Sequence, residues 1–353
     1  MLLIEFGISA AVIVTAGIFL AKSSENIAEI TGLGQMVIGS ILLSFATSLP
    51  ELVTTVSAVR LTVVDLGLGN ILGSNMFNLI ILALLDLVQG PGPLLLQLSL
   101  SHLMSGLINL LMLSILGISL AFYSFITVSP LQFRIAPESI ILVIIFLLGL
   151  KLIHGYDKKD RDKQRKAARE AEDSEKIISL SEARAAAPAV KEKKNLYQYL
   201  IFALAALATL LAGIRLTAAA DEIAAVSGLG HSFLGAALLA VITSLPELTT
   251  TLTAAKNKSY DLAAGNILGS NLFNLLLLVA ADIFQPGSLI AAASPLNFLP
   301  LFALIIMIVL LMAGLCYRSE FSAYYLGASP ALILLVYLLT LWLMFAFRDI
   351  PII

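Results

Sequence analysis

The chain has 353 residues, of which 59% are hydrophobic and only 12% are charged, about half the charged share usual in soluble domains. This composition excludes an ordinary soluble protein and predicts an integral membrane protein that lies in a lipid bilayer. The net charge of −2 gives no basis for a nucleic-acid partner. No obligatory protein partner and no cofactor are evident from the sequence.

Ten apolar runs are long enough to cross a bilayer core of about 30 Å, which takes roughly 20 residues per helix. Five runs precede a polar loop and five follow it. The predicted spans are 2–21, 35–59, 66–88, 103–126, 136–154, 197–220, 231–255, 262–284, 297–317 and 325–347. The sequence therefore predicts an all-α membrane protein with ten transmembrane helices.

The polar loop, residues 155–196, separates a first five-helix repeat (1–154) from a second (197–353). Of the 21 Lys and Arg residues, 13 lie between Lys151 and Lys194. Because basic residues favour the cytoplasmic side of a membrane, we expect this loop in the cytoplasm. An odd number of spans before the loop then places both termini of this multi-pass cell-membrane protein outside. We expect the loop to be a solvated tether with some helix rather than a regulatory module.

The two halves repeat each other at an offset of 196 residues. TSLPEL begins at Thr47 and again at Thr243, and GNILGSN begins at Gly69 and again at Gly265. Since each repeat holds an odd number of spans, the second enters the membrane upside down, as in the inverted repeats of secondary transporters. Duplication for structure alone is the alternative. It does not explain why the repeated residues are polar at mid-membrane, where packing favours Leu, Val and Gly.

Two glutamates, Glu51 and Glu247, lie well inside the second and seventh predicted spans. An ionised side chain at this depth costs several kcal/mol unless it meets a partner, a cation or water. No Lys or Arg lies at comparable depth in either repeat, so a structural salt bridge, the alternative, lacks a partner. We expect the missing counter-charge to be a transported ion.

Other oxygen-bearing groups surround each glutamate in the sequence. A proline precedes each one and removes a helical hydrogen bond, which frees carbonyl oxygens near Ala46 and Ile242. Hydroxyls three and four residues earlier share the face of each glutamate on a helix. These hydroxyls belong to Thr47, Ser48, Thr243 and Ser244.

The third and eighth predicted spans carry polar stripes with a four-residue spacing. The first stripe is Asn70, Ser74 and Asn78, and the second is Asn266, Ser270 and Asn274. We expect both stripes to face the glutamates, although amides that merely join helices are the alternative. The neighbouring glycines, such as Gly73 and Gly269, are expected to permit close helix packing.

All of these candidate ligands are oxygen atoms, which favours hard cations such as Na⁺ and Ca²⁺ over zinc or copper. Two carboxylates carry −2, which matches one Ca²⁺, and calcium suits a dry, flexible site better than magnesium. We expect His102, His154 and His231 to be ordinary interfacial residues. Aspartates recur near the helix ends as expected caps or vestibule charges: Asp65, Asp86, Asp261 and Asp282.

The paired motifs, ATSLPELVTTVSA with GNILGSNMFN and ITSLPELTTTLTA with GNILGSNLFN, resemble the calcium/cation antiporter superfamily, in particular its sodium/calcium exchanger branch of prokaryotic type. The resemblance implies a secondary active antiporter that exchanges Ca²⁺ for Na⁺ by alternating access at clustered cation positions. The implied side-chain ligands are Glu51, Glu247, Thr47, Ser48, Thr243, Ser244, Ser74, Asn78, Ser270 and Asn274. It also implies backbone carbonyl ligands at Ser44 and Ala240, and no catalytic residue.

One departure from that pattern is Asn274, because some exchangers carry an aspartate there. It leaves potassium dependence and sodium stoichiometry open. A Ca²⁺/H⁺ antiporter of the same superfamily is the first alternative, although the full motif pair favours sodium. An intramembrane acid protease is disfavoured because Tyr260-Asp261 matches only half of such a signature and no Gly-x-Gly-Asp follows. A cation channel is disfavoured because inverted repeats with interrupted helices are typical of transporters.

Overall fold

A computed structural model of the whole chain describes residues 2–88, 94–125, 136–176, 192–225, 235–284, 288–317, 322–323 and 326–347. Within these residues the protein is helical apart from one antiparallel pair of two-residue strands, β1 (Ser322–Ala323) and β2 (Leu326–Gly327). The all-helical expectation is confirmed for the described part of the chain.

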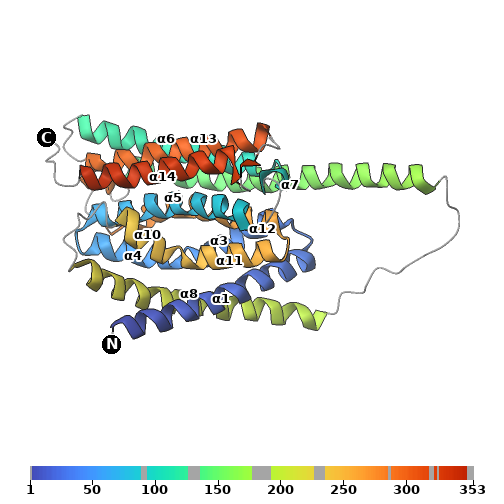
Figure 1. Cartoon of the computed structure of the whole chain (residues 1–353), viewed down its shortest axis with the longest axis horizontal. Helices are drawn as coiled ribbons and strands as arrows, with labels where there is room; N and C mark the ends of the chain where they lie inside the picture. Colours follow the sequence, from blue (N-terminus) through green and yellow to red (C-terminus); the bar gives the residue numbers. More distant parts are fainter. Residues whose placement is uncertain are drawn as a thin grey trace.

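The first half contains, in chain order, α1 (Leu2–Thr31), α2 (Gln35–Ile38), the π-helix η1 (Gly39–Leu43), α3 (Ser44–Thr47), α4 (Leu49–Arg60), α5 (Val64–Val88), the 3₁₀ turn η2 (Leu94–Leu96), α6 (His102–Phe125) and α7 (Pro137–Lys176). The helix α7 continues well beyond the predicted end of its span at 154, and it projects from the bundle in Figure 1. Part of the predicted polar loop is therefore helical, and residues 177–191 of that loop lie outside the described residues.

The second half contains α8 (Glu192–Ala225), the π-helix η3 (Gly235–Leu239), α10 (Ala240–Thr243), α11 (Leu245–Lys256), α12 (Tyr260–Asp282), the 3₁₀ turns η4 (Ile290–Ala292) and η5 (Pro295–Asn297), α13 (Phe298–Tyr317) and α14 (Ala328–Ala346). The π-helices η1 and η3 occupy repeat-related positions. The start of the seventh predicted span, residues 231–234, lies outside the described residues.

Eight helices among the described residues are long and apolar enough to cross a membrane, and the number rises to ten if each of two bent helix pairs counts as one span. The bent pairs coincide with the second and seventh predicted spans. The bend is 45° between residues 35–47 and 49–60, and 51° between residues 236–243 and 245–256. The protein is thus a multi-pass membrane protein in which two candidate spans are broken in the middle.

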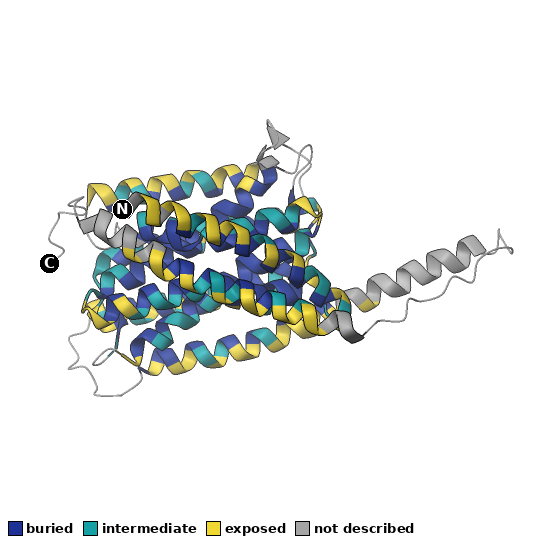
Figure 2. Cartoon of the chain, turned by 90° about the horizontal axis from the view of Figure 1, so that it is seen from below, coloured by how far each residue is buried: buried dark blue, intermediate teal, exposed yellow. Residues whose placement is uncertain are grey.

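The helices form three layers (Figure 1). The broken pairs pack with α5 and α12 in the central layer, α1 and α8 lie together on one side, and α6, α13 and α14 lie on the other. The most buried helices are α5 and α12, with 89% and 78% of their apolar windows buried. Residues coloured as exposed follow the outer faces of the flanking helices (Figure 2). The helices α5 and α12 are therefore mostly enclosed by the other described helices.

The backbones of the central layer approach each other closely where each π-helix crosses a long helix of the other repeat. A Cβ atom added at Gly73 of α5 would lie 2.4 Å from the carbonyl oxygen of Ala236 in η3. The repeat-related pair is Gly269 and Ser40, again at 2.4 Å. Only glycine fits at either position, which confirms the expected packing role of these residues.

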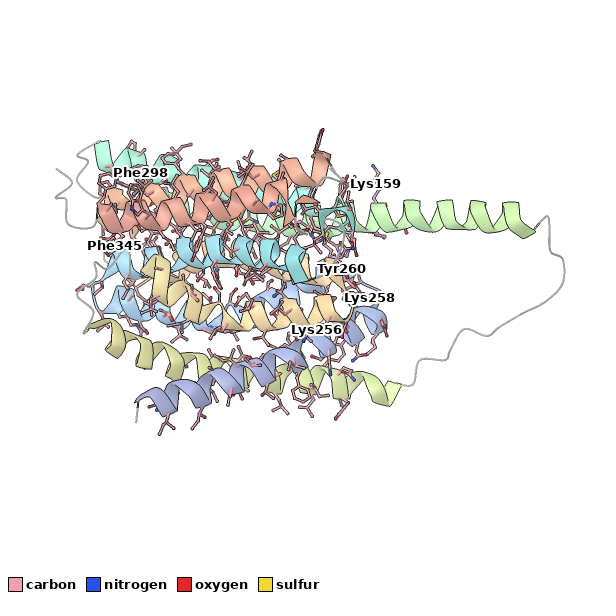
Figure 3. All side chains as sticks on the ribbon, viewed as in Figure 1. Lys159, Lys256, Lys258, Tyr260, Phe298 and Phe345 are labelled. Carbon is pink, nitrogen blue, oxygen red and sulfur yellow. The ribbon has the colours of Figure 1, made fainter. Side chains whose placement is uncertain are left out.

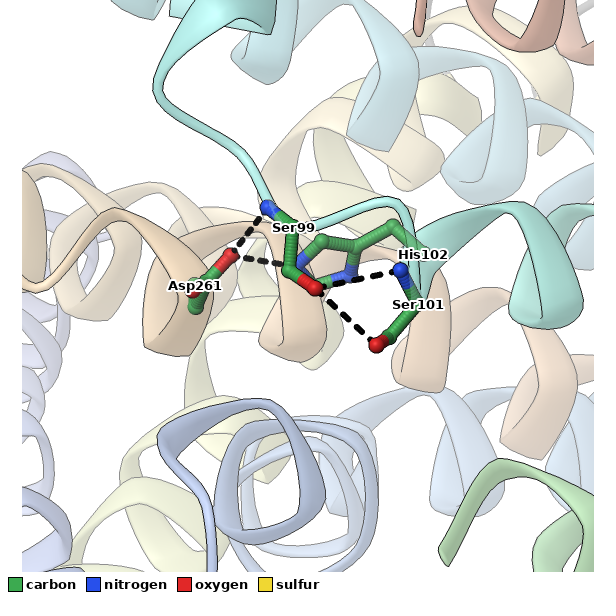
Figure 4. Close-up of polar contacts among 4 residues, drawn as sticks. All are labelled: Ser99, Ser101, His102 and Asp261. Atoms are coloured by element: carbon green, nitrogen blue, oxygen red, sulfur yellow. Dashed lines mark hydrogen bonds and ion pairs between the residues drawn. The ribbon is translucent and has the colours of Figure 1, made fainter. Parts of the chain in front are cut away.

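The four recurring aspartates cap loops that enter the bundle. Asp261 accepts hydrogen bonds from the backbone N–H of Ser99 (2.8 Å) and from His102 Nε2 (2.9 Å), as Figure 4 shows. Its repeat mate Asp65 accepts from Ser294 N–H at 2.7 Å and from Asn297 Nδ2 at 2.8 Å. The backbone N–H groups of Leu94 and Leu289 donate to Asp86 and Asp282. The expected capping role is confirmed.

The interpretation of His102 as an ordinary interfacial residue is wrong. Its side chain is fully buried at the junction between α6 and α12, because Asp261 offers a carboxylate oxygen there. His154 is exposed, and His231 lies outside the described residues.

Candidate cation site

The two broken helices have nearly identical backbones at the break. Ser48 has φ −84° and ψ 6°, and Ser244 has φ −85° and ψ 10°. Pro50 and Pro246 lie in the first turn of α4 and α11, where a missing backbone N–H costs nothing. The sequence predicted that each proline removes a helical hydrogen bond within its span, and the structure bends each span there, by 45° and 51°, with a new helix starting just before the proline. This geometry places each glutamate in the first turn of its new helix, near mid-span.

Glu51 and Glu247 are both fully buried, at 0% exposure. Ser48 Oγ donates to Glu247 Oε1 at 3.2 Å, and Ser244 Oγ donates to Glu51 Oε1 at 3.2 Å. Each glutamate is therefore bound by a serine of the opposite repeat. The second oxygen of each carboxylate, Oε2, has no hydrogen-bond partner among the described residues.

The threonines before each break lie against the polar stripe of the other repeat. Thr47 Oγ1 lies 3.3 Å from Ser270 Oγ, and Ser270 Oγ donates to Glu247 Oε1 at 3.2 Å. In the mirrored arrangement, Thr243 Oγ1 lies 3.3 Å from Ser74 Oγ. The second stripe therefore reaches Glu247 through Ser270, and the first stripe meets Thr243 through Ser74.

The two backbone carbonyls implied by the family resemblance lie beside these hydroxyls. The carbonyl oxygen of Ser44 accepts from Thr47 Oγ1 at 3.3 Å. That of Ala240 accepts from Ser74 Oγ and from Thr243 Oγ1, each at 3.4 Å. Both carbonyls therefore belong to the same polar cluster as the glutamates.

The stripe asparagines Asn78 and Asn274 are fully buried, and the Oδ1 atom of each lacks a hydrogen-bond partner in the described part of the chain. Two asparagines that the sequence analysis did not single out, Asn75 and Asn271, lie beside them and are also fully buried. Their repetition in the sequence could have identified them, because each is the last residue of a GNILGSN motif. They were not included in the stripes because they fall outside the four-residue spacing.

The cluster contains two carboxylates, those of Glu51 and Glu247. Among the described residues, no Lys or Arg forms an ion pair with Glu51 or Glu247. Nor do three His, Cys, Asp or Glu side chains gather in the described chain into a metal-binding group. A bound cation would therefore be held by two carboxylates together with hydroxyl, amide and carbonyl oxygens, which suits a hard cation.

A family model described as "Sodium/calcium exchanger protein" matches residues 1–153 and 197–346 of this chain. The chain belongs to this exchanger family. It is a cation antiporter rather than an enzyme, and the part between the two matched segments is the predicted polar loop.

Individual relatives agree with this membership. The exchanger is 28% identical over 275 residues to CaxA of Alkalimonas amylolytica, covering 77% of each chain. It is 40% identical to the sodium/calcium exchanger MaX1 of Methanosarcina acetivorans over 62 residues, which cover 17% of this chain and 18% of that one. Solved structures of the sodium-calcium exchanger NCX_Mj share its fold, one with a TM-score of 0.65 at 20% identity over 97% of this chain and 99% of the other.

The exchanger's two flanking helices break the symmetry of its repeats. A Cβ atom at Gly213 of α8 would lie 2.6 Å from Pro50 Cγ, whereas one at the repeat-related Gly17 of α1 would lie 2.9 Å from Thr249. The symmetric counterpart of Pro50 is Pro246, three residues before Thr249. Thus the contact of Gly17 with α11 lies three residues, nearly one helical turn, farther toward the C-terminal end of that helix than the contact of Gly213 with α4.

A cavity of about 170 Å³ lies between α8 and α4. It is lined by Val53, Thr54, Ser57, Ala58, Leu61, Val63, Leu66, Ile214 and Ala218. The hydrogen bonds of repeat-related asparagines also differ between the two repeats. Asn266 Nδ2 donates to Thr250 and Thr251 at 2.9 and 3.0 Å, while its mate Asn70 Nδ2 has no partner among the described residues. The first repeat is therefore less tightly closed around the polar cluster than the second.

Proposed function

We propose that the protein exchanges Ca²⁺ for Na⁺ across the cell membrane by alternating access. The observation that carries this proposal is the pair of fully buried glutamates, each bound by a serine of the other repeat and neither in an ion pair with a described Lys or Arg. Burying −2 without compensation is strongly unfavourable, and one Ca²⁺ or several Na⁺ neutralise it.

The proposed ligands are the groups that meet in this cluster. Side-chain oxygens come from Glu51, Glu247, Thr47, Ser48, Thr243, Ser244, Ser74, Asn78, Ser270 and Asn274, with backbone carbonyls from Ser44 and Ala240. No cofactor takes part, and Ca²⁺ and Na⁺ are the transported substrates. The flexible oxygen coordination of Ca²⁺ fits hydroxyl, amide and carbonyl ligands better than the strict octahedron of Mg²⁺.

The proposed architecture has ten spans in two inverted five-helix repeats, residues 1–154 and 197–353, joined by the loop 155–196. Each bent helix pair then counts as one span, and its broken ends deliver ligands at mid-membrane. Lys159, Lys256 and Lys258 lie at the end of the bundle from which α7 projects, with Phe298 and Phe345 at the other end (Figure 3). This charge distribution supports a cytoplasmic loop and external termini.

Alternating access would come from α1 and α8 moving against the central layer. The cavity beside α8 lies between the site and the end of α4 at Arg60, which this topology places outside. The structure then corresponds to an outward-directed conformation. Since an empty site would retain its buried −2 charge, only the loaded carrier would switch, which couples the two cations.

Sodium coupling is supported by the complete motif pair and by the name of MaX1, a sodium/calcium exchanger. The second candidate is Ca²⁺/H⁺ exchange, because a carboxylate is also neutralised by a proton. Uptake of ⁴⁵Ca²⁺ into proteoliposomes separates the two. We expect uptake under an outward sodium gradient at constant pH, and none under a pH gradient without sodium. The opposite pattern would establish proton coupling.

A further inference from the structure

Two asparagines outside the proposed ligand set hold two ligand amides in place. Asn78 Nδ2 donates to Asn271 Oδ1 at 2.9 Å, and Asn274 Nδ2 donates to Asn75 Oδ1 at 2.9 Å. Each of these bonds joins α5 to α12, so the residue that holds an amide always belongs to the other repeat.

Asn75 and Asn271 are themselves fixed by a second reciprocal pair of bonds. Asn75 Nδ2 donates to the backbone oxygen of Asn271 at 3.1 Å, and Asn271 Nδ2 donates to that of Asn75 at 3.2 Å. Each side chain thus has its N–H₂ group turned to the opposite backbone and its Oδ1 turned to the opposite ligand amide. All four side chains are fully buried.

This arrangement decides which end of Asn78 and Asn274 remains free. Because their Nδ2 atoms are occupied, the atoms left without a partner in the described chain are Oδ1 of Asn78 and Oδ1 of Asn274. An amide turned by 180° would present N–H donors, which repel a cation, in place of an acceptor oxygen. A buried acceptor without a partner is unfavourable unless a ligand or water satisfies it.

We propose that Asn75 and Asn271 are positioning residues that keep the oxygen atoms of Asn274 and Asn78, respectively, directed at the cation. The proposal rests on the proposed function for the identity of the site. It adds that each ligand amide is set by the opposite repeat, so the amide ligands keep their orientation as long as α5 and α12 stay packed, whatever α1 and α8 do.

The crossed pattern gives a double-mutant test. Ca²⁺ dissociation constants are measured calorimetrically on the purified protein carrying Asn→Ala at positions 75, 78, 271 and 274, singly and in pairs. We expect Asn75→Ala and Asn271→Ala each to weaken Ca²⁺ binding about twofold to tenfold, the scale of one hydrogen bond. The crossed pairs are 75 with 274 and 271 with 78. Once Asn274 or Asn78 is alanine, the further substitution Asn75→Ala or Asn271→Ala, respectively, should weaken Ca²⁺ binding little more.

The same-helix pairs, 75 with 78 and 271 with 274, are the matched controls, and there the fold-changes should multiply. Multiplication in all four pairs would overturn the proposal. So would variants of Asn75 and Asn271 that melt at lower temperature yet bind Ca²⁺ as the wild type does, because that result assigns them a purely structural role. If Ca²⁺ transport by the wild-type protein is driven by protons, sodium coupling is contradicted. The comparison of Ca²⁺ dissociation constants among the variants still tests the role of Asn75 and Asn271.

Discussion

Ser48 in the first repeat donates a hydrogen bond to Glu247 in the second, 3.2 Å from Oγ to Oε1, and the mirrored bond joins Ser244 to Glu51 at the same distance. Neither repeat therefore completes the surroundings of its own glutamate. The asparagine bonds between α5 and α12 also run from one repeat to the other. A half-chain could not assemble the polar cluster, which explains why the repeat motifs occur together.

The close helix crossing at Gly73 predicts a large effect of the smallest possible substitution. Gly73→Ala places a Cβ 2.4 Å from the backbone oxygen of Ala236, so η3 must move away from α5. We expect a loss of about 1–3 kcal/mol in unfolding free energy, as for overpacked cores. Thermal unfolding of the purified protein measures it. Gly155→Ala is the control, since nothing lies within 4 Å of the added Cβ there. Equal melting temperatures for the two variants would contradict the close packing.

Much of this site could be predicted because the same polar residues occur twice at a fixed offset. The glutamates, the hydroxyls before them and the stripes of α5 and α12 were all identified from residue type and spacing. Asn75 and Asn271 were missed because their role depends on contacts between the repeats, which spacing along one helix does not reveal. His102 was misjudged for the same reason, since its partner Asp261 lies 159 positions away.

The positions of α1 and α8 against the broken helices could not be predicted from the sequence either. A repeated sequence is symmetric, whereas a transporter at any moment opens to one side, and both conformations share one sequence. Only the structure shows that Gly213 lies against Pro50 while Gly17 lies against Thr249.

The proposed movement of α1 and α8 against the central layer predicts unequal access to two repeat-related positions. Ser57 is exposed beside the cavity at α8, whereas its mate Thr253 is partly buried in α11, the helix against which α1 packs. With Cys316 replaced by serine, we expect Ser57→Cys to react quickly with an impermeant thiol reagent from outside. Thr253→Cys should react slowly from the cytoplasmic side. Ion conditions that favour the opposite conformation should make position 253 react faster than position 57. Equal labelling rates at both positions under every condition would rule out the proposed movement of α1 and α8.

The proposed membrane orientation predicts one-sided labelling of the loop. Ser174 lies within the charged segment, and the excess of basic residues there favours the cytoplasm. In the same Cys316→Ser background, Ser174→Cys should be labelled by an impermeant reagent in permeabilised cells or inverted vesicles but not in intact cells. Labelling in intact cells would place the loop outside and invert the proposed topology.

The two glutamates predict the strongest effect on transport. Glu51→Gln or Glu247→Gln keeps the size of the side chain but leaves a single negative charge, which no longer matches a divalent cation. We expect either substitution to abolish ⁴⁵Ca²⁺ uptake under a saturating sodium gradient. Glu5→Gln is the matched control, because Glu5 is an exposed carboxylate that pairs with Arg215 at 3.5 Å. Near-normal flux in both site variants would refute the two-glutamate mechanism.

Charge balance also predicts how the rate of Ca²⁺ uptake depends on the membrane potential. If three Na⁺ leave for each Ca²⁺ that enters, one net positive charge leaves per cycle, and 100 mV contributes about 2.3 kcal/mol to each turnover. Ca²⁺ uptake should therefore be faster at an inside-positive potential than at zero, and slower at an inside-negative one. Clamping wild-type proteoliposomes at these three potentials with the sodium gradient held constant measures the effect. Flux that ignores the potential would contradict the three-to-one stoichiometry alone, because an electroneutral exchange of two Na⁺ for one Ca²⁺ neutralises the same pair of carboxylates.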